Sequence, residues 1–130
     1  MERKCLAVID DDVDICRMVD EYAKALKLAT QLFTQGFTSG TSFLNFLTHN
    51  PSEIDAMLMD GRLGSRPNGV ETAQRALEIN LGILLFGMSG ESRYNAHFMR
   101  LGAVLSVDKN NLDRMIPCIL QTVIDNKPTS

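Results

Sequence analysis

The chain has 130 residues and a net charge of −3 at neutral pH, with 45% hydrophobic and 22% charged residues. This length supports one domain with a single core, and the composition is that of an ordinary soluble globular protein. The negative charge and the lack of a basic run argue against a nucleic-acid-binding surface. No apolar stretch approaches the roughly 20 residues that span a bilayer, and the first apolar run is too short for a signal peptide. We therefore expect a cytoplasmic protein without a membrane span.

The three cysteines form no recognisable metal-binding or disulfide pattern. Cys5, Cys16 and Cys118 are odd in number and far apart, and no CxxC spacing occurs. The spacing predicts neither a zinc site nor a disulfide framework. We expect three reduced and mostly buried thiols.

Short apolar runs alternate with helical patterns along the whole chain. Strands are expected over residues 4–9, 28–34, 54–59, 83–88 and 103–107. Helices are expected over residues 15–26, 38–50, 68–77, 93–101 and 112–123. Asp12 or Asp14 should cap the first helix, and Pro117 should kink or delay the last one. Residues 126–130 are expected to be a frayed tail.

This alternation predicts an α/β fold of the (βα)5 type. Continuous apolar strands between amphipathic helices indicate a parallel sheet that is covered on both faces. Right-handed crossovers leave few topologies for such a chain. The expected fold is thus a doubly wound, flavodoxin-like five-stranded parallel sheet, with residues 1–130 forming a single domain.

Three of the expected strands end in residues that can handle a phosphoryl group. Asp10, Asp11 and Asp12 follow the first strand, Asp60 follows the third and Lys109 follows the fifth. Side chains at the carboxyl ends of parallel strands converge on one crevice, where ligands bind. The sequence therefore predicts one pocket that holds several carboxylates and an ammonium group, suited to a divalent cation and a phosphoryl group.

The chemistry of these residues suggests a role for each. Asp60 is the candidate nucleophile, because a carboxylate can accept a phosphoryl group as an acyl phosphate. Asp10 and Asp11 are candidate Mg²⁺ ligands, since adjacent carboxylates repel each other without a cation. Lys109 would pair with Asp60 and then with a phosphoryl oxygen. Asp12 is the member of the acidic run that we assign to helix capping alone.

The order of these motifs resembles that of response-regulator receiver domains over essentially the whole chain. The matching segments are Val8-Ile9-Asp10-Asp11-Asp12, Leu58-Met59-Asp60, Asn68-Gly69, Ser89-Gly90, Leu101-Gly102-Ala103 and Val107-Asp108-Lys109. The resemblance implies a phosphorylation-controlled switch, and not a classical enzyme, that accepts a phosphoryl group on Asp60 from a histidine kinase or a histidine phosphotransfer protein. It also implies Mg²⁺ bound directly by Asp11, Asp60 and the Arg62 carbonyl, with Asp10 acting mainly through water. The implied downstream partners are an output domain or target protein, or a second copy bound through the last two α/β elements.

Two further features of the resemblance concern the hydroxyl that contacts the phosphoryl group and the residues that flank the attacking water. Counting forward from Asn68-Gly69 places this hydroxyl at Ser89, whereas counting back from Lys109 lands on Gly87, and we favour Ser89. In the family, the positions two past the phosphoacceptor and two past the hydroxyl flank the attacking water. Arg62 and Glu91 occupy these positions. One interpretation is that both are simply surface charges, and the other is that the pair tunes the lifetime of an acyl phosphate.

The chain departs from the family pattern near its end. Ser106 stands where receivers commonly carry an aromatic residue, and Asn110 replaces the proline that usually follows the lysine. The usual coupling between hydroxyl and aromatic ring therefore cannot operate in its familiar form, and we expect a switch that is weaker or routed differently. One alternative interpretation is a degenerate receiver that acts as a constitutive interaction module. A haloacid-dehalogenase-type phosphatase, with Asp10 as nucleophile and Asp12 as acid/base, is a weaker alternative because it needs a later acidic pair.

Overall fold

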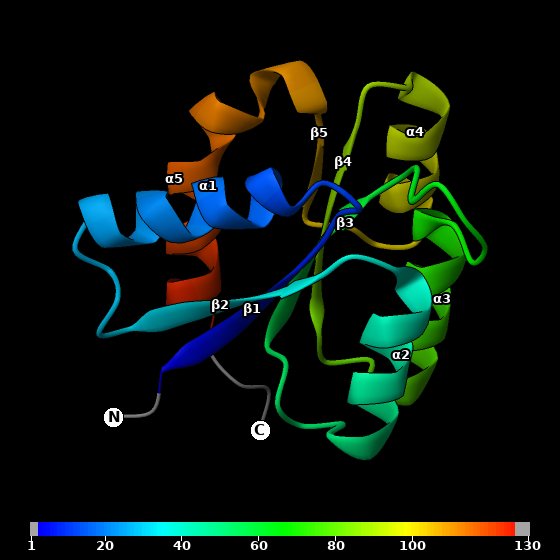
Figure 1. Ribbon diagram of the computed structural model, residues 1–130, viewed down its shortest axis with the longest axis horizontal. Helices are drawn as coiled ribbons and strands as arrows, with labels where there is room; N and C mark the ends of the chain where they lie inside the picture. Colours follow the sequence, from blue (N-terminus) through cyan, green and yellow to red (C-terminus); the bar gives the residue numbers. More distant parts are fainter. Residues whose placement is uncertain (1–2, 127–130) are drawn as a thin grey trace.

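The computed structural model describes residues 3–126, and it contains the predicted alternation of strands and helices (Figure 1). The strands are β1 (Lys4–Ile9), β2 (Leu32–Phe37), β3 (Ala56–Asp60), β4 (Leu84–Ser89) and β5 (Leu105–Asp108). The helices are α1 (Val13–Ala25), α2 (Gly40–His49), α3 (Gly69–Ile79), α4 (Ser92–Arg100), the short 3₁₀ helix η1 (Lys109–Asn111) and α5 (Leu112–Asp125). The expected frayed tail lies, apart from Asn126, outside the described residues.

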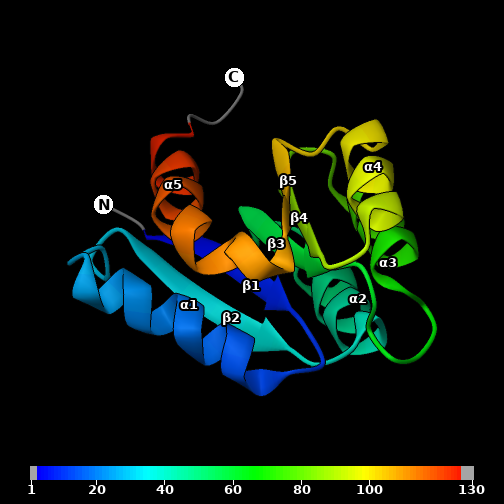
Figure 2. The ribbon, with the colours of Figure 1, turned by 90° about the horizontal axis from the view of Figure 1, so that it is seen from above.

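All five strands pair in parallel in the order β2-β1-β3-β4-β5. Helices α1 and α5 cover one face of this sheet, and α2, α3 and α4 cover the other (Figures 1 and 2). The predicted doubly wound, flavodoxin-like (βα)5 fold is therefore confirmed.

Successive side chains along each strand point to opposite faces of the sheet, so each strand contributes to the core on both sides. Met57 and Met59 of β3 pack with the α2–α4 side, whereas Leu58 between them packs with the α1–α5 side. All three side chains are fully buried. The central strands are thus apolar throughout, which is why they read as continuous runs in the sequence.

The expected position of β2 was wrong by four residues at its start. Residues 28–31 belong instead to the turn that ends α1, where the Leu28 N–H donates to the Ala23 carbonyl and Lys27 has a φ of 60°. Leu28 packs against the α1–α5 side of the core, so its hydrophobicity reflects helix packing and not a strand. The strand begins at Leu32, which is buried.

Local sequence signals placed most helix ends correctly. Asp12, and not Asp14, is the N-cap of α1, and its side chain accepts a hydrogen bond from the Asp14 N–H. Asn68 and Glu71 form a capping box at the start of α3. Helix α5 begins at Leu112 and includes Pro117, so the proline does not delay the helix.

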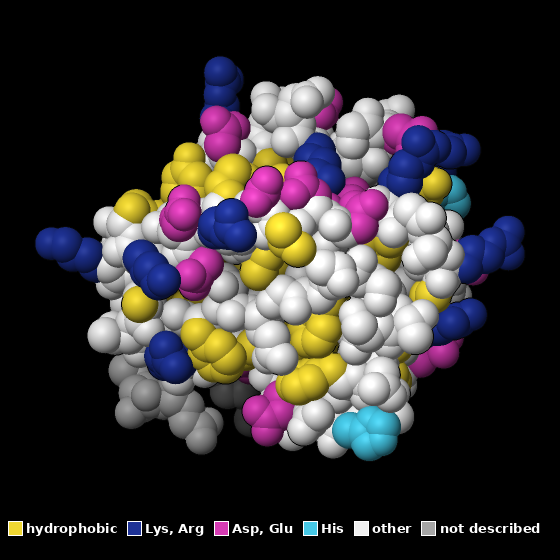
Figure 3. Space-filling model, viewed as in Figure 1, with side chains coloured by type: hydrophobic (Ala, Val, Ile, Leu, Met, Phe, Trp, Pro, Cys, Tyr) yellow, Lys and Arg dark blue, Asp and Glu magenta, His cyan; other side chains and the backbone are white. Residues whose placement is uncertain are grey.

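The three cysteines, the surface charges and the helix lengths can be compared with the expectations from the sequence. Cys5 is buried and Cys16 half-buried, but Cys118 is exposed on α5, so the expectation of mostly buried thiols was wrong for Cys118. On the face shown in Figure 3, the described basic side chains are scattered among acidic ones. Among the described residues, no helix has both the length and the apolar character that crossing a membrane demands.

Candidate functional site at the carboxyl edge of the sheet

Three predicted carboxylates come together at the carboxyl edge of the sheet. Asp10 and Asp11 follow β1, Asp60 ends β3, and one oxygen from each lies within 4.8 Å of the others. Asp10 and Asp60 are buried, while Asp11 is exposed. These hard oxygen donors fit Mg²⁺, which prefers a few carboxylates and retained waters.

Lys109 joins two of these carboxylates. Its Nζ lies 2.7 Å from Asp10 Oδ2 and 3.1 Å from Asp60 Oδ2. The pairing with Asp60 agrees with the sequence-based expectation, whereas the contact with Asp10 was not anticipated. Asp108 fixes the backbone beside Lys109 by accepting a hydrogen bond from the Asn110 N–H at 2.9 Å. A proline at position 110 has no N–H for this bond, so Asn110 provides a different anchor for the lysine.

Backbone donors orient the buried carboxylates. Asp10 Oδ1 accepts from the Asp12 N–H at 2.8 Å, and Asp60 Oδ1 accepts from the Arg62 N–H at 3.3 Å. Each carboxylate thereby directs its Oδ2 toward Lys109. The arrangement leaves one ammonium group to offset two buried carboxylates and their exposed neighbour Asp11.

The electrostatics of the site follow from this imbalance. Burial raises the pKa of Asp10 to about 6, although the hydrogen bonds from Lys109 and Asp12 oppose the shift. Burial also raises the pKa of Asp60, against the charge of Lys109. For Lys109, burial alone lowers the pKa, but Asp10 and Asp60 outweigh it and raise the pKa. Lys109 therefore stays charged, whereas Asp10 and Asp60 take up protons more readily than ordinary carboxylates do. A bound cation would displace such protons.

If Mg²⁺ is the ion that this cluster takes, the raised pKa of Asp10 should make its binding depend on pH. Below about pH 6 the site holds a proton that the cation must displace, so the affinity should fall by about tenfold per pH unit. For a carboxylate with an ordinary pKa, this decline would begin only near pH 4. Calorimetric Mg²⁺ titrations across this range would measure it. In Asp10→Asn the break near pH 6 should disappear, and a break that persists in this variant would contradict the assignment to Asp10.

The structure distinguishes the positions of Ser89 and Gly87. Ser89 is the last residue of β4 and is 3% exposed, and its hydroxyl accepts a hydrogen bond from the Glu91 N–H at 3.0 Å. Gly87 lies inside the strand, paired with Met59, one residue before the end of β3. Of the two candidates, the fold thus places Ser89 at the edge of the sheet that carries the carboxylates.

Arg62 and Glu91 form the ion pair that their positions suggested. Arg62 Nη2 lies 3.5 Å from Glu91 Oε1, and Arg93 Nη2 lies 3.6 Å from the same oxygen. The two loops that follow Asp60 and Ser89 are therefore bridged by charge. Sequence reasoning missed Arg93, because its role depends on where the first turn of α4 is placed.

Close backbone packing positions the loop between β3 and α3. The Gly69 N–H donates to the Gly61 carbonyl at 3.1 Å, and a Cβ on Gly69 would collide with the Asp60 carbonyl oxygen. A Cβ on Gly64, which has a φ of 76°, would lie 3.1 Å from Asp11 Oδ2. The glycines of this loop thus let the backbone approach the carboxylates.

Sequence reasoning also missed Asn95 on α4. Its Nδ2 donates to the Ser89 carbonyl at 3.0 Å, and its Oδ1 accepts from the Ser106 hydroxyl at 2.6 Å. A polar residue on an amphipathic helix gives no sign of such contacts, because they depend on how α4 packs against β4 and β5.

Comparisons with known proteins support the fold assignment. No protein-family model matches the chain, and no curated protein sequence does. Among solved structures, the chain is similar to the non-phosphorylated HemR receiver domain of Leptospira biflexa, with a TM-score of 0.81, 15% identity and coverage of 98% of this chain and 99% of that one. It is also similar to a BeF₃-activated DrrB receiver domain, with a TM-score of 0.77, 17% identity and coverage of 96% and 100%.

A third similar structure is a response regulator from Burkholderia pseudomallei with a phosphorylated aspartic acid, a calcium ion and citrate. Its TM-score is 0.71 at 16% identity, and the match covers 93% of this chain and 68% of that one. These matches agree with the resemblance drawn from the motifs and with the strand order of the sheet. The chain therefore has the fold of the response-regulator receiver domains.

Proposed function

We propose that the chain is a receiver that accepts a phosphoryl group on Asp60 from a phosphohistidine of a histidine kinase or phosphotransfer protein. The observation that carries this proposal is the contact of Lys109 with both Asp10 and Asp60 beside a cluster of three carboxylates. A purely structural module has no need of these groups together at one sheet edge. In the proposal, Asp10, Asp11, Asp60 and the Arg62 carbonyl hold Mg²⁺.

The proposed transfer makes few demands on the protein beyond position and charge. An Asp60 carboxylate oxygen attacks the phosphorus, and the bond between phosphorus and the donor's imidazole nitrogen breaks. The electron pair of that bond stays on the nitrogen, and a donor whose other ring nitrogen carries a proton leaves as a neutral histidine. Mg²⁺, when bound, offsets charge on the transferred oxygens. Lys109 moves from the Asp60 carboxylate to a phosphoryl oxygen, and the Ser89 hydroxyl donates to another. The added negative charge then biases the surface near α4 and β5.

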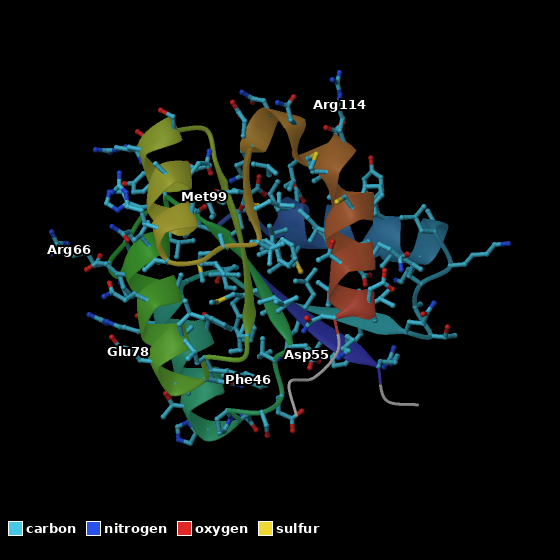
Figure 4. The ribbon with its side chains drawn as sticks, turned by 180° about the vertical axis from the view of Figure 1, so that it is seen from behind. Phe46, Asp55, Arg66, Glu78, Met99 and Arg114 are labelled. Carbon is cyan, nitrogen blue, oxygen red and sulfur yellow. The ribbon has the colours of Figure 1, made fainter. Side chains whose placement is uncertain are left out.

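Two of the similar structures are consistent with this proposal. One contains a phosphorylated aspartic acid and a calcium ion, and another is a receiver activated by BeF₃. The proposed downstream partner, an output domain, a target protein or a second copy, would bind on the side of α4 and β5. Met99, labelled on α4 in Figure 4, and Val104 before β5 are 49% and 45% exposed there.

An intact-mass measurement tests the proposal directly. The protein is incubated with a small-molecule phosphodonor, with Mg²⁺ or with a chelator. We expect a single phosphoryl adduct that depends on Mg²⁺. A folded protein that binds Mg²⁺ and forms no adduct, even with phosphohistidine donors, would instead favour a constitutive interaction module.

The ion pair between Arg62 and Glu91 should control how long the adduct lasts. Because the pair bridges the two loops that flank the site, Arg62→Ala is expected to expose the acyl phosphate to water and shorten its half-life severalfold. The half-life is followed by intact mass after removal of the donor. Arg66→Ala is the matched control, since Arg66 belongs to the same loop and projects into solvent (Figure 4). Equal half-lives for both variants and the wild type would rule out this role for Arg62.

A further inference from the structure

A hydrogen-bonded link connects the end of β4 to β5 through helix α4. Asn95 Nδ2 donates to the Ser89 carbonyl at 3.0 Å, and the Ser106 hydroxyl donates to Asn95 Oδ1 at 2.6 Å. Both bonds are partly buried, and they join residues 6 and 11 positions apart in the sequence. The Ser89 segment therefore has a direct polar connection to β5.

The amide side chain of Asn95 supplies both the donor and the acceptor that these two bonds need. The Ser89 carbonyl can only accept, so Asn95 must supply an N–H to it, while the Ser106 hydroxyl needs an acceptor. An aspartate at position 95 would keep the acceptor and lose the donor. An alanine would lose both, so the two halves of the link can be separated by substitution.

Ser106 and Phe98 both lie close to Gly87. Gly87 and Ser106 are direct neighbours across β4 and β5, and the fully buried Phe98 of α4 lies over them. A Cβ on Gly87 would collide with the Phe98 ring and with Ser106 Oγ. The Phe98 ring and the Ser106 hydroxyl thus fill the space beside Gly87, and the same hydroxyl donates to Asn95.

We propose that Asn95 is a positioning residue that couples the Ser89 segment to β5 in place of an aromatic residue at position 106. This inference rests on the proposed function, because it assigns a route for the response to a phosphoryl group on Asp60. When Ser89 moves to donate its hydroxyl to that group, its carbonyl moves too. Asn95 carries this change to Ser106, and so to the α4–β5 surface.

The test compares the response at the two ends of the link. Amide NMR spectra are recorded with Mg²⁺, before and after addition of beryllofluoride. In the wild type, we expect shifts at Asp60 and Ser89 and also at Ser106 and Val107. In Asn95→Asp, the shifts at Asp60 and Ser89 should persist, whereas those at Ser106 and Val107 should be mostly lost.

Further variants separate coupling from simple loss of structure. Ser106→Ala breaks the other bond and should reduce the response at Val107 as Asn95→Ala does, and the double variant should lose no more. Ser106→Thr keeps the hydroxyl and should retain the response. His97→Ala, at an exposed position of the same helix, is the matched control and should behave as the wild type. Thermal unfolding identifies the variants that are folded and can be compared.

The outcomes distinguish this inference from the proposed function. If the wild type shows no shift at Asp60 or Ser89, the proposed function fails and the inference fails with it. If the wild type responds and the Asn95 and Ser106 variants respond equally at both ends, the function stands and the inference is wrong.

Discussion

Asp60→Asn is expected to abolish formation of the phosphoryl adduct. The amide has no anionic oxygen to attack phosphorus, and it removes one of the three carboxylates that cluster within 4.8 Å. We expect a loss of at least about 100-fold in the rate of adduct formation, since the nucleophile and one of the proposed metal ligands are both removed. Intact mass after incubation with a small-molecule phosphodonor measures this loss.

The fold of this variant should be retained. Replacing Asp60 removes a buried charge that faces Asp10 and Asp11, which offsets the loss of one partner for Lys109. Asp113→Asn is a matched control on α5, where the side chain is exposed, and it should form the adduct like the wild type. A phosphoryl group that still appears on a folded Asp60→Asn protein would show that Asp60 is not the acceptor.

Gly69→Ala is expected to have the largest effect on stability. A Cβ at this position would collide with the Asp60 carbonyl oxygen and would lie 2.7 Å from the Asp60 carbonyl carbon and 2.9 Å from Gly61 Cα. These contacts are with backbone, which cannot rotate away as a side chain can. Overpacking of this kind costs about 3 kcal/mol of unfolding free energy or more, and chemical denaturation would measure it.

The same substitution should also disturb the candidate site, because relief of the clash moves the strand end that carries Asp60. Gly90→Ala is the matched control, since nothing lies within 4 Å of a Cβ built there. Its unfolding free energy should change by less than about 1 kcal/mol. Similar stabilities for the two variants would contradict the packing that places α3 against the end of β3.

The candidate site shows how far a sequence alone can be interpreted. Parallel strands present their carboxyl ends at one edge, so residues that follow apolar runs could be grouped without a structure. The grouping of Asp10, Asp11, Asp60 and Lys109 was predicted in this way, and the structure brings them together. Their chemical roles remain predictions.

The contact of Lys109 with Asp10 and the contacts of Asn95 could not be predicted. Whether Lys109 reaches Asp60 alone or Asp10 as well depends on side-chain directions across three strands. The link through Asn95 depends on the rotation and depth of α4 over β4 and β5. The periodicity of the sequence gives neither these side-chain directions nor the placement of α4. It identifies the buried face of a helix but not the residues that this face contacts.

The start of β2 was predicted wrongly for the same reason, because it depends on tertiary packing and not on local sequence. The order of the elements could be predicted from the sequence, as could a cap at Asp12 or Asp14 and a helix that starts near Asn68, because these depend on side chains close together in the chain. The packing of Leu28 with α1 and α5 and the bond from Ser106 to Asn95 of α4 depend on tertiary structure and could not be predicted. Hydrophobicity shows that a residue is buried, whereas its partners are fixed by how separate elements pack together.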